Sequence, residues 1–487
     1  MTSRRSSPVP TSAWIERLGL HRPELLAWAL WDCANSAFMT TIVAAVFPIY
    51  FATVAAAGMP PEQATFRFGL ATTAAMVFIA ILGPILGAVA DTTPVKKLFL
   101  ATFQTLAIAA TAGMYFILRG DWVLALSLFV LGNVGIYGSL VFYDSLLPHI
   151  AAPEELDRVS TAGYALGYLG GGALLAVNLA WIQQPQWFGI PDSAMGVRLS
   201  FLSVAVWWML FSIPLFRRVP EPALGVPGPA GADAARHPGI GAVLSASMRQ
   251  LGATLGEIRR YRNAFLMLLA FLVYNDGIST IIRMATIYGT EIGIGQQHLI
   301  AALLLAQFVG VPFSFLFGML AGRLGPKNAI YVALLVYSLA TGFGFVMRTA
   351  AHFYVLAFLV GTVQGGAQAL SRSLFASMIP KAKTSEFFGF FGVFEKVSGI
   401  LGPLLFSLTL GAFGSGRIAI VSVLVFFVAG AALLTTVDIE AGQAATRTEP
   451  GPTADARGSP LSQRPGKSLG GTARAAESVA SRPDDKL

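Results

Sequence analysis

Twelve apolar stretches, each long enough to cross a lipid bilayer, constrain the fold of this 487-residue chain more than any other feature. A transmembrane helix needs about 20 apolar residues. Only 12% of the residues are charged and 55% are hydrophobic, whereas soluble domains have about 25% charged residues. The sequence therefore predicts an all-α membrane protein with 12 transmembrane helices, and it excludes a soluble globular enzyme. The predicted spans are 27–51, 68–90, 98–118, 122–143, 161–182, 199–216, 264–288, 299–321, 328–347, 353–376, 387–411 and 417–437.

The basic residues between the spans predict the orientation of the chain. With the N-terminus in the cytoplasm, the cytoplasmic loops hold fourteen Lys and Arg residues and the opposite loops hold five. Basic residues concentrate in cytoplasmic loops, so we expect both termini inside. The composition is poor in Lys and rich in Arg, Ala and Gly, which favours a bacterial inner membrane. This topology also accounts for the net charge of +8 without a nucleic-acid partner.

Five segments follow from this pattern. Residues 1–26 are predicted to be a cytoplasmic N-terminal segment, 27–216 a six-helix bundle, 217–262 a cytoplasmic loop, 263–438 a second six-helix bundle, and 439–487 a disordered cytoplasmic tail. Within the loop, 241–262 alternates apolar and basic residues as an amphipathic helix does. A solvated linker helix would produce the same pattern, so both interpretations stay open.

The two halves of the chain repeat one another at an offset of 231 residues. The sequence GAVADTTPVKK after the second span matches GMLAGRLGPKN after the eighth. The same offset aligns Asn133 with Gln364 and Tyr137 with Gln368. In membrane carriers built from two repeats, the substrate site lies between the repeats near the middle of the bilayer.

The repeated loop resembles the loop between helices 2 and 3 of the major facilitator superfamily. The matching residues, predicted to form gating loops, are Gly87, Asp91, Lys96 and Lys97 in the first copy and Gly318, Arg323, Gly325 and Lys327 in the second. In the second copy Gly322 replaces the acidic residue of that motif.

Three longer sequences narrow the resemblance: WALWDCANSAFMTTIVAAVFPIYF, FLVYNDGISTIIRMATIYG, and GGAQALSRSLFASMIP leading into EFFGFFGVFEKVSGILGPLLF. They are similar to the vacuolar amino-acid effluxer-like branch of the superfamily, which includes the autophagy-related vacuole effluxers and bacterial relatives, and the similarity covers residues 25–437. It implies a secondary transporter that works by alternating access, driven by protons or another gradient, with a small polar solute such as an amino acid as its substrate.

Asp276, beside Asn275, is the leading candidate for a proton or substrate-amine site. It lies in the seventh span, about 18 Å from the span's start at 1.5 Å per residue, and a charge at that depth is costly enough to suggest function. A structural ion pair with Arg283, seven residues further along the chain, is the alternative.

Glu395 and Lys396 form a second charged group in the eleventh span. Adjacent helical residues point about 100° apart, so we expect the two side chains not to neutralise each other, and Asp276 is the expected partner of Lys396. A transport role and structural pairing with a neighbouring helix both remain open.

Asp32 and Asn35 share one face of the first span, three residues apart. Asp32 is a candidate gate residue, or alternatively an acid of the first helical turn close to water.

Gln364, Gln368 and Arg372 recur every four residues in the tenth span. The repeat aligns the first two with Asn133 and Tyr137 of the fourth span. We expect these amides and the phenol to face the central cavity and bind substrate, whereas Arg372 is expected to extend toward the lipid headgroups.

The sequence predicts no cofactor, because it contains no phosphate-binding loop, and no metal site, because it has one cysteine and scattered histidines. The five histidines fall in loops or at span ends, which argues against a buried imidazole. We expect a monomeric carrier in the bilayer that binds a small-molecule substrate and protons. Two alternatives remain: a receptor or scaffold that acts through its cytoplasmic loop and tail, and an intramembrane hydrolase or lipid transferase.

Overall fold

The computed structural model of the chain describes residues 16, 18–222, 249, 260–291 and 293–447, and within these ranges all regular secondary structure is helical. Twelve helical segments are long and apolar enough to span a membrane. Each overlaps one of the stretches predicted from the apolar pattern. The prediction of an all-α protein with 12 transmembrane helices is therefore confirmed.

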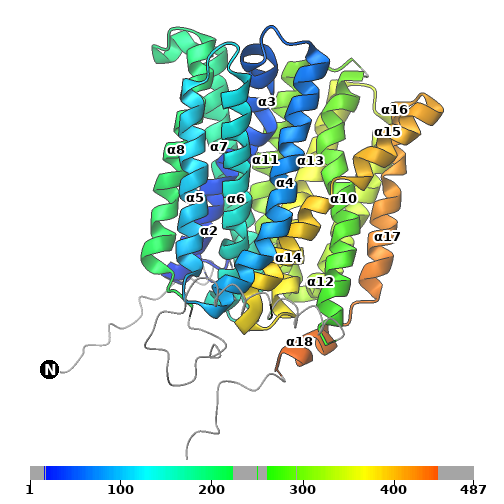
Figure 1. Cartoon of the computed structure of the whole chain (residues 1–487). Helices are drawn as coiled ribbons and strands as arrows, with labels where there is room; N and C mark the ends of the chain where they lie inside the picture. Colours follow the sequence, from blue (N-terminus) through cyan, green and yellow to red (C-terminus); the bar gives the residue numbers. More distant parts are fainter. Residues whose placement is uncertain (1–15, 17, 223–248, 250–259, 292, 448–487) are drawn as a thin grey trace, which may run out of the picture. The chain divides into compact units, whose positions relative to one another are not determined.

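The first six spans form one half of the bundle (Figure 1). Their segments are α2 (Pro23–Ala37), η1 (Phe38–Ala45), α3 (Phe47–Tyr50) and η2 (Phe51–Ala55), then α4 (Pro61–Thr92), α5 (Lys96–Gly113), η3 (Met114–Phe116), α6 (Trp122–Ile150), α7 (Leu156–Gln183), η4 (Pro185–Phe188) and α8 (Ser193–Arg218).

The last six spans form the other half. Their segments are α10 (Arg262–Glu291), α11 (Gln296–Leu324), α12 (Pro326–Val346), α13 (Ala350–Ser377), η6 (Lys381–Lys383), α14 (Thr384–Val397), α15 (Leu401–Phe413), α16 (Gly416–Ser422) and α17 (Leu424–Thr435).

The first and eleventh spans are irregular, each for a local reason. In the first span, η1 is a π-helix that ends three residues before Pro48. Proline has no N–H, and its ring displaces the carbonyl four residues earlier, so the chain there widens from the α-helical pattern. In the eleventh span, Gly399 adopts a φ of 137° between α14 and α15, a conformation that favours glycine.

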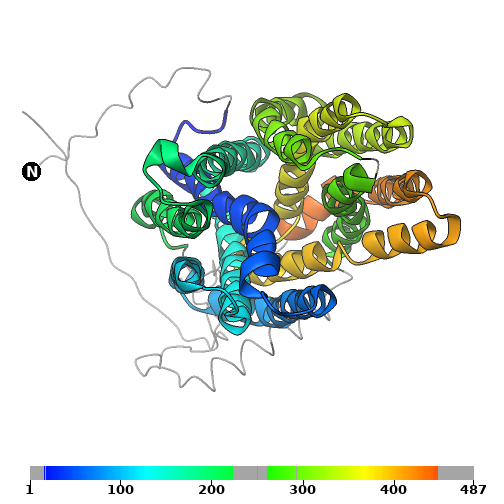
Figure 2. The ribbon, with the colours of Figure 1, turned by 90° about the horizontal axis from the view of Figure 1, so that it is seen from above.

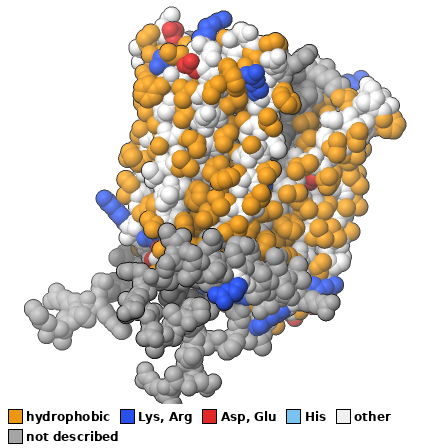
Figure 3. Space-filling model, in the orientation of Figure 1, with side chains coloured by type: hydrophobic (Ala, Val, Ile, Leu, Met, Phe, Trp, Pro, Cys, Tyr) orange, Lys and Arg blue, Asp and Glu red, His pale blue; other side chains and the backbone are white. Residues whose placement is uncertain are grey.

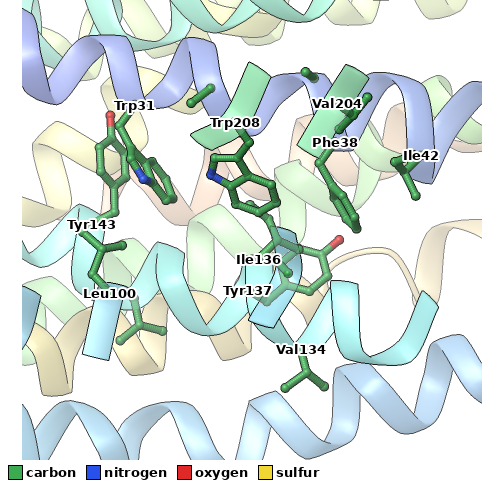
Figure 4. Close-up of a cluster of buried hydrophobic side chains, with 14 of the residues drawn as sticks. Trp31, Phe38, Ile42, Leu100, Val134, Ile136, Tyr137, Tyr143, Val204 and Trp208 are labelled. Atoms are coloured by element: carbon green, nitrogen blue, oxygen red, sulfur yellow. The ribbon is translucent and has the colours of Figure 1, made fainter. Parts of the chain in front are cut away.

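Aromatic side chains form the core of the first half (Figure 4). Trp31 stacks on Tyr143 with ring centroids 4.2 Å apart, and it meets Trp208 edge-on at 6.4 Å. Phe38 packs against the other side of Trp208. These contacts join α2, α6 and α8, because large rings at helix crossings bury much apolar surface.

The two halves lie side by side when the bundle is seen from above (Figure 2). Helix α14 of the second half packs along α4, and α11 packs along α7. We call the end of the bundle at which α2 begins and α17 ends the terminal end. On the face drawn in Figure 3, hydrophobic side chains cover the middle, and most Lys and Arg side chains lie near the two ends.

Two predicted segment boundaries differ from the structure. Helix α2 begins at Pro23, inside the predicted N-terminal segment. Residues 439–447, predicted to be disordered, form α18 (Ile439–Arg447), where Gln443 donates a hydrogen bond to the Ser377 hydroxyl at the end of α13. The amphipathic helix predicted in the central loop and the tail beyond residue 447 lie outside the described residues.

Candidate functional site

A small pocket lies between α4 and α6 of the first half and α14 of the second half. Its polar lining comes from Tyr137 and Asp144 on α6 and from Glu395 and Lys396 on α14. Phe388 and Phe391 are part of its apolar wall. The pocket thus combines a cation, two carboxyl groups and a phenol at a contact between the halves. Three of these four polar residues were predicted from the sequence.

Glu395 and Lys396 pair with each other, contrary to the prediction from their helical spacing. The Lys396 Nζ atom lies 3.1 Å from Glu395 Oε2 and 3.8 Å from the centre of the Tyr137 ring. The 100° between the two Cα–Cβ directions is overcome because both side chains are long enough to bend toward each other. Lys396 also gains a cation–π contact with Tyr137.

Asp276 caps the second half of the broken eleventh span. Its Oδ2 accepts a hydrogen bond from the Leu401 backbone N–H at 3.1 Å, and its Oδ1 accepts one from the Gly402 N–H at 2.9 Å. The first N–H groups of a helix have no partner within the helix, and a carboxylate is a strong acceptor for them. The neighbouring Asn275 donates to the Ser398 hydroxyl at 2.5 Å, within the break.

The expected partnership of Asp276 with Lys396 is therefore wrong, since Lys396 pairs with Glu395 and Asp276 binds the start of α15. The alternative partner of Asp276 was Arg283, and the side chain of Arg283 lies outside the described part of the structure.

Arg372 is the centre of a buried polar network that joins the halves. Its Nη1 atom lies 3.0 Å from Asp144 Oδ1, and its Nη2 atom lies 3.4 Å from Asp32 Oδ2. Its Nε atom donates to the Ser160 hydroxyl at 3.0 Å. The guanidinium also lies over the Trp28 ring, 4.8 Å from its centre. Spans 1, 4, 5 and 10 are thereby held together by one side chain.

The expectation that Arg372 reaches toward lipid headgroups is wrong, because only 3% of its surface is exposed. The first-turn alternative for Asp32 is also wrong: Asp32 is buried and lies in the third turn of α2. Asp144 was missed by the sequence analysis. Its signal was present, since Asp144 directly follows the last residue of the predicted span 122–143, and an acid so close to a span needs a partner.

A second polar group joins the halves at the terminal end. Asp91 accepts hydrogen bonds from the backbone N–H groups of Ser385, at 3.1 Å, and Glu386, at 2.8 Å. Lys96 Nζ lies 2.7 Å from Asp91 Oδ1 and donates to the Thr384 hydroxyl at 2.7 Å. Asp91, which lies in the last turn of α4, thus binds the positive end of the α14 dipole.

Gly87 lies at the same contact. A Cβ atom at this position would come within 2.6 Å of the Ser385 carbonyl carbon, so only glycine allows α4 and α14 to approach this closely. His149, dismissed by the sequence analysis, also belongs here: its Nε2 atom lies 3.1 Å from the Thr384 hydroxyl and 3.4 Å from Lys96 Nζ.

Lys97 and Lys327 cap helix ends within their own halves. Lys97 Nζ donates to the carbonyls of Phe216 and Val219 at the end of α8, and Lys327 Nζ donates to those of Thr435 and Val437 at the end of α17. Each lysine is the second residue of its helix, so the two halves share this contact, although the offset of 231 residues aligns Lys327 with Lys96.

The remaining residues of the second loop are spread along α11 and its end. A Cβ atom at Gly318 would collide with Thr161 of α7, Arg323 lines a separate pocket, and Gly325 adopts a φ of 81° before α12.

The other predicted substrate contacts do not gather around the pocket. Asn35 donates to the Trp31 carbonyl and to Asp32 Oδ1. Asn133 donates to the Phe129 carbonyl, and its buried Oδ1 atom has no partner in the described structure. Gln364 and Gln368 are half-buried on α13. Among the described residues, no cluster of three His, Cys, Asp or Glu side chains could hold a metal ion.

The family described as "Vacuole effluxer Atg22 like" matches residues 64–447. The chain belongs to this Atg22-like family of the major facilitator superfamily. An MFS-type transporter of Bacillus subtilis, YxiO, is 37% identical over 416 residues, covering 85% of this chain and 94% of YxiO. Autophagy-related protein 22 of Yarrowia lipolytica is 27% identical over 306 residues, covering 59% of this chain and 51% of the fungal protein.

Solved structures show the same fold. The proton:xylose symporter XylE matches with a TM-score of 0.63 at 14% identity, covering 87% of this chain and 98% of XylE. A bacterial homologue of the iron transporter ferroportin, in its outward-facing state, matches with a TM-score of 0.58 at 14% identity. The match covers 85% of this chain and 98% of the homologue.

This Atg22-like family member is therefore a multi-pass membrane transporter and not an enzyme. The alternative of a receptor or scaffold is not favoured, because the relatives and the fold are those of transporters.

Proposed function

We propose that this protein is a proton-coupled secondary transporter of amino acids. The observation that carries the proposal is the pocket between α4, α6 and α14, in which Lys396 lies beside Glu395 and Tyr137 and which Asp144 also lines. An amino acid carries one positive and one negative group, and this lining offers a partner for each. Most binding pockets combine an apolar wall with a few such polar groups.

Binding would proceed by exchange of partners. The substrate carboxylate would take Lys396 from Glu395, and the substrate ammonium group would take Glu395 in return. Because the Lys396–Glu395 pair already exists, each charge keeps a counter-charge when the pocket is empty. Buried charges without partners are costly, so the pair stabilises the empty carrier. Phe388 and Phe391 would contact the apolar side chain of the substrate.

Alternating access would use the polar contacts at the terminal end as a gate. The contacts of Arg372 and Asp91 join the halves there. We infer cytoplasmic termini from the basic loops, so this is the state closed to the cytoplasm. Opening requires the Arg372 and Asp91 contacts to separate. We also infer a monomer in a bacterial inner membrane, on the basis of the composition.

Proton coupling would act through Asp276. Ionised, its two oxygens accept the Leu401 and Gly402 N–H groups, whereas a protonated carboxyl has one fewer strong acceptor. Protonation would loosen the start of α15, five residues beyond Lys396. Protonation of Asp276 would thereby change the position of the end of α14, which lines the pocket.

The test is uptake of pooled labelled amino acids into proteoliposomes, with and without an imposed proton gradient. We expect gradient-driven accumulation that falls at least tenfold in Glu395→Gln and in Lys396→Gln. The matched control is Glu154→Gln, which changes an exposed acid on the first half at the terminal end. If the wild-type protein accumulates no amino acid, or if the pocket variants transport as well as the control, the proposal is wrong.

A further inference from the structure

A second pocket lies at the terminal end between α7 of the first half and α11 of the second. It is lined by Arg158, Met319, Gly322 and Arg323. Arg158 is the third residue of the fifth span, and Arg323 is the last but one of the eighth. The pocket therefore lies where the spans end, at the level of the lipid headgroups or just beyond them.

Both arginines of this pocket lack a partner within the part of the chain that the structure describes. Neither guanidinium makes a hydrogen bond or an ion pair there. Four other basic residues at this end differ: Arg372 pairs with carboxylates of the other half, and Lys96 pairs with Asp91 of its own half. Lys97 and Lys327 bind helix-end carbonyls. Two adjacent cations without a counter-charge repel each other, and an anion between them removes the repulsion.

The repeat explains why the pocket lacks an acid. At the offset of 231 residues, Gly322 occupies the position of Asp91. In the first copy, Asp91 supplies the carboxylate that binds Lys96 and the start of α14. In the second copy no side chain fills this position, and a Cβ atom on Gly322 would meet only Arg158 Nη2, at 3.6 Å. The place that a carboxylate at position 322 would occupy is thus next to the Arg158 guanidinium.

We propose that this pocket binds a phosphate-bearing anion, which bridges Arg158 on α7 and Arg323 on α11 and stabilises closure of the terminal end. Guanidinium groups bind phosphate oxygens through paired N–H donors. The source is either the headgroup of an anionic lipid or soluble phosphate, because basic pockets between spans at the membrane surface accept both kinds of phosphate. The site does not depend on which solute the protein transports.

The test measures the thermal stability of the purified protein in detergent during titration with phosphatidylglycerol, phosphatidylcholine or inorganic phosphate. A ligand that binds only the folded protein stabilises it by RT ln(1 + c/Kd), where c is the free ligand concentration, so the melting temperature rises with the ligand concentration. We expect phosphatidylglycerol or inorganic phosphate to raise it, and phosphatidylcholine to have no effect. In Arg158→Gln and in Arg323→Gln the apparent affinity should fall about tenfold. Arg348→Gln, an exposed arginine at the opposite end, should match the wild-type protein.

The outcomes separate the two sources of the anion. A response to phosphatidylglycerol alone identifies a lipid site, and a response to inorganic phosphate identifies a site for a soluble anion. Equal responses of Arg158→Gln, Arg323→Gln and Arg348→Gln would overturn the proposal, as would no response to either ligand.

Gly322→Asp supplies the acid that the second copy lacks. We expect this variant to be more stable than the wild-type protein without added ligand and to lose the response to the anion, because its own carboxylate pairs with Arg158. The exposed position of Gly322 leaves room for the side chain. A Gly322→Asp variant that responds to the anion as the wild-type protein does would contradict the bridging role.

Discussion

Arg372 and Asp276 show how much of this transporter depends on single buried side chains. Arg372 joins four spans through Asp32, Asp144 and Ser160. Asp276 supplies the first hydrogen bonds of α15. In both cases the polar group is buried together with its partners, which makes the loss of one partner more costly than the loss of all of them.

Arg372→Gln should lower the free energy of unfolding by about 3–5 kcal/mol, because it leaves Asp32 and Asp144 buried without their counter-charge. The triple variant Arg372→Gln, Asp32→Asn, Asp144→Asn should recover most of this loss in stability, because none of these three buried positions then carries a charge. Thermal unfolding in detergent measures both. A triple variant that is less stable than Arg372→Gln would show that the charges do not account for the effect.

Asp276→Asn should lower the free energy of unfolding by about 1–3 kcal/mol, because one oxygen cannot replace two as acceptors of the Leu401 and Gly402 N–H groups. The same variant should lose gradient-driven uptake. Asp192→Asn is the control: Asp192 caps α8 with a single hydrogen bond to Met195, and asparagine caps a helix equally well. Equal stability of the two variants would exclude the capping role of Asp276.

The broken eleventh span is the most informative element. Its two halves, α14 and α15, meet at Gly399, and the break lies next to the charged end of the pocket. Where a helix is interrupted within a membrane bundle, the N–H groups that start its second part have no partner in the helix. Such a break is stable only if neighbouring residues accept hydrogen bonds from these groups. Asp276 of α10 accepts the N–H groups of Leu401 and Gly402, and the neighbouring Asn275 donates to the Ser398 hydroxyl. These contacts couple the seventh span to the eleventh.

Gly402→Ala should disturb this coupling. A Cβ atom at Gly402 would lie 2.8 Å from Asp276 Oδ1 and even closer to the Thr280 hydroxyl, so we expect a loss of about 1–3 kcal/mol in stability and reduced uptake. Gly411→Ala lies on the same helix, with no atom within 4 Å of the added Cβ, and should gain up to about 1 kcal/mol. Melting curves of the two variants compare them directly; a Gly402→Ala protein as stable as Gly411→Ala would contradict the close contact.

At the scale of the whole molecule, the balance between open and closed states depends on how closely the halves approach. Helices α4 and α14 touch through Gly87 and Ser385, and α7 and α11 touch through Thr161 and Gly318. Glycine at these points lets backbones come together as in other membrane bundles. The acid of the first copy and the arginine pocket of the second then make the two contacts chemically different.

Gly87→Ala should shift the protein toward opening of the terminal end, because the added methyl group cannot fit against the Ser385 backbone. We would measure this with spin labels at Glu154→Cys and Asn328→Cys, in a Cys33→Ser background, as a longer distance between the labels. Gly69→Ala on the same helix has no atom within 4 Å of its Cβ and should leave the distance unchanged. Identical distances in the two variants would show that Gly87 does not control closure.

The sequence alone determined the twelve spans and the repeat between the halves, and it led to the family. These properties depend on local hydropathy and on residue order, both of which can be read without knowing which helices touch. It also pointed to Tyr137, Glu395 and Lys396, since charged and polar groups stand out within apolar spans.

Only the tertiary structure decided which polar groups pair. Arg372 and Asp32 are 340 residues apart, and Asp276 and Gly402 are 126 apart, so no local pattern connects them. The sequence analysis paired Lys396 with Asp276 and placed Arg372 among the headgroups, because it could count positions along a helix but not the neighbours of that helix. Partners of buried charges are set by how helices from the two halves pack, and that packing is a property of the whole bundle.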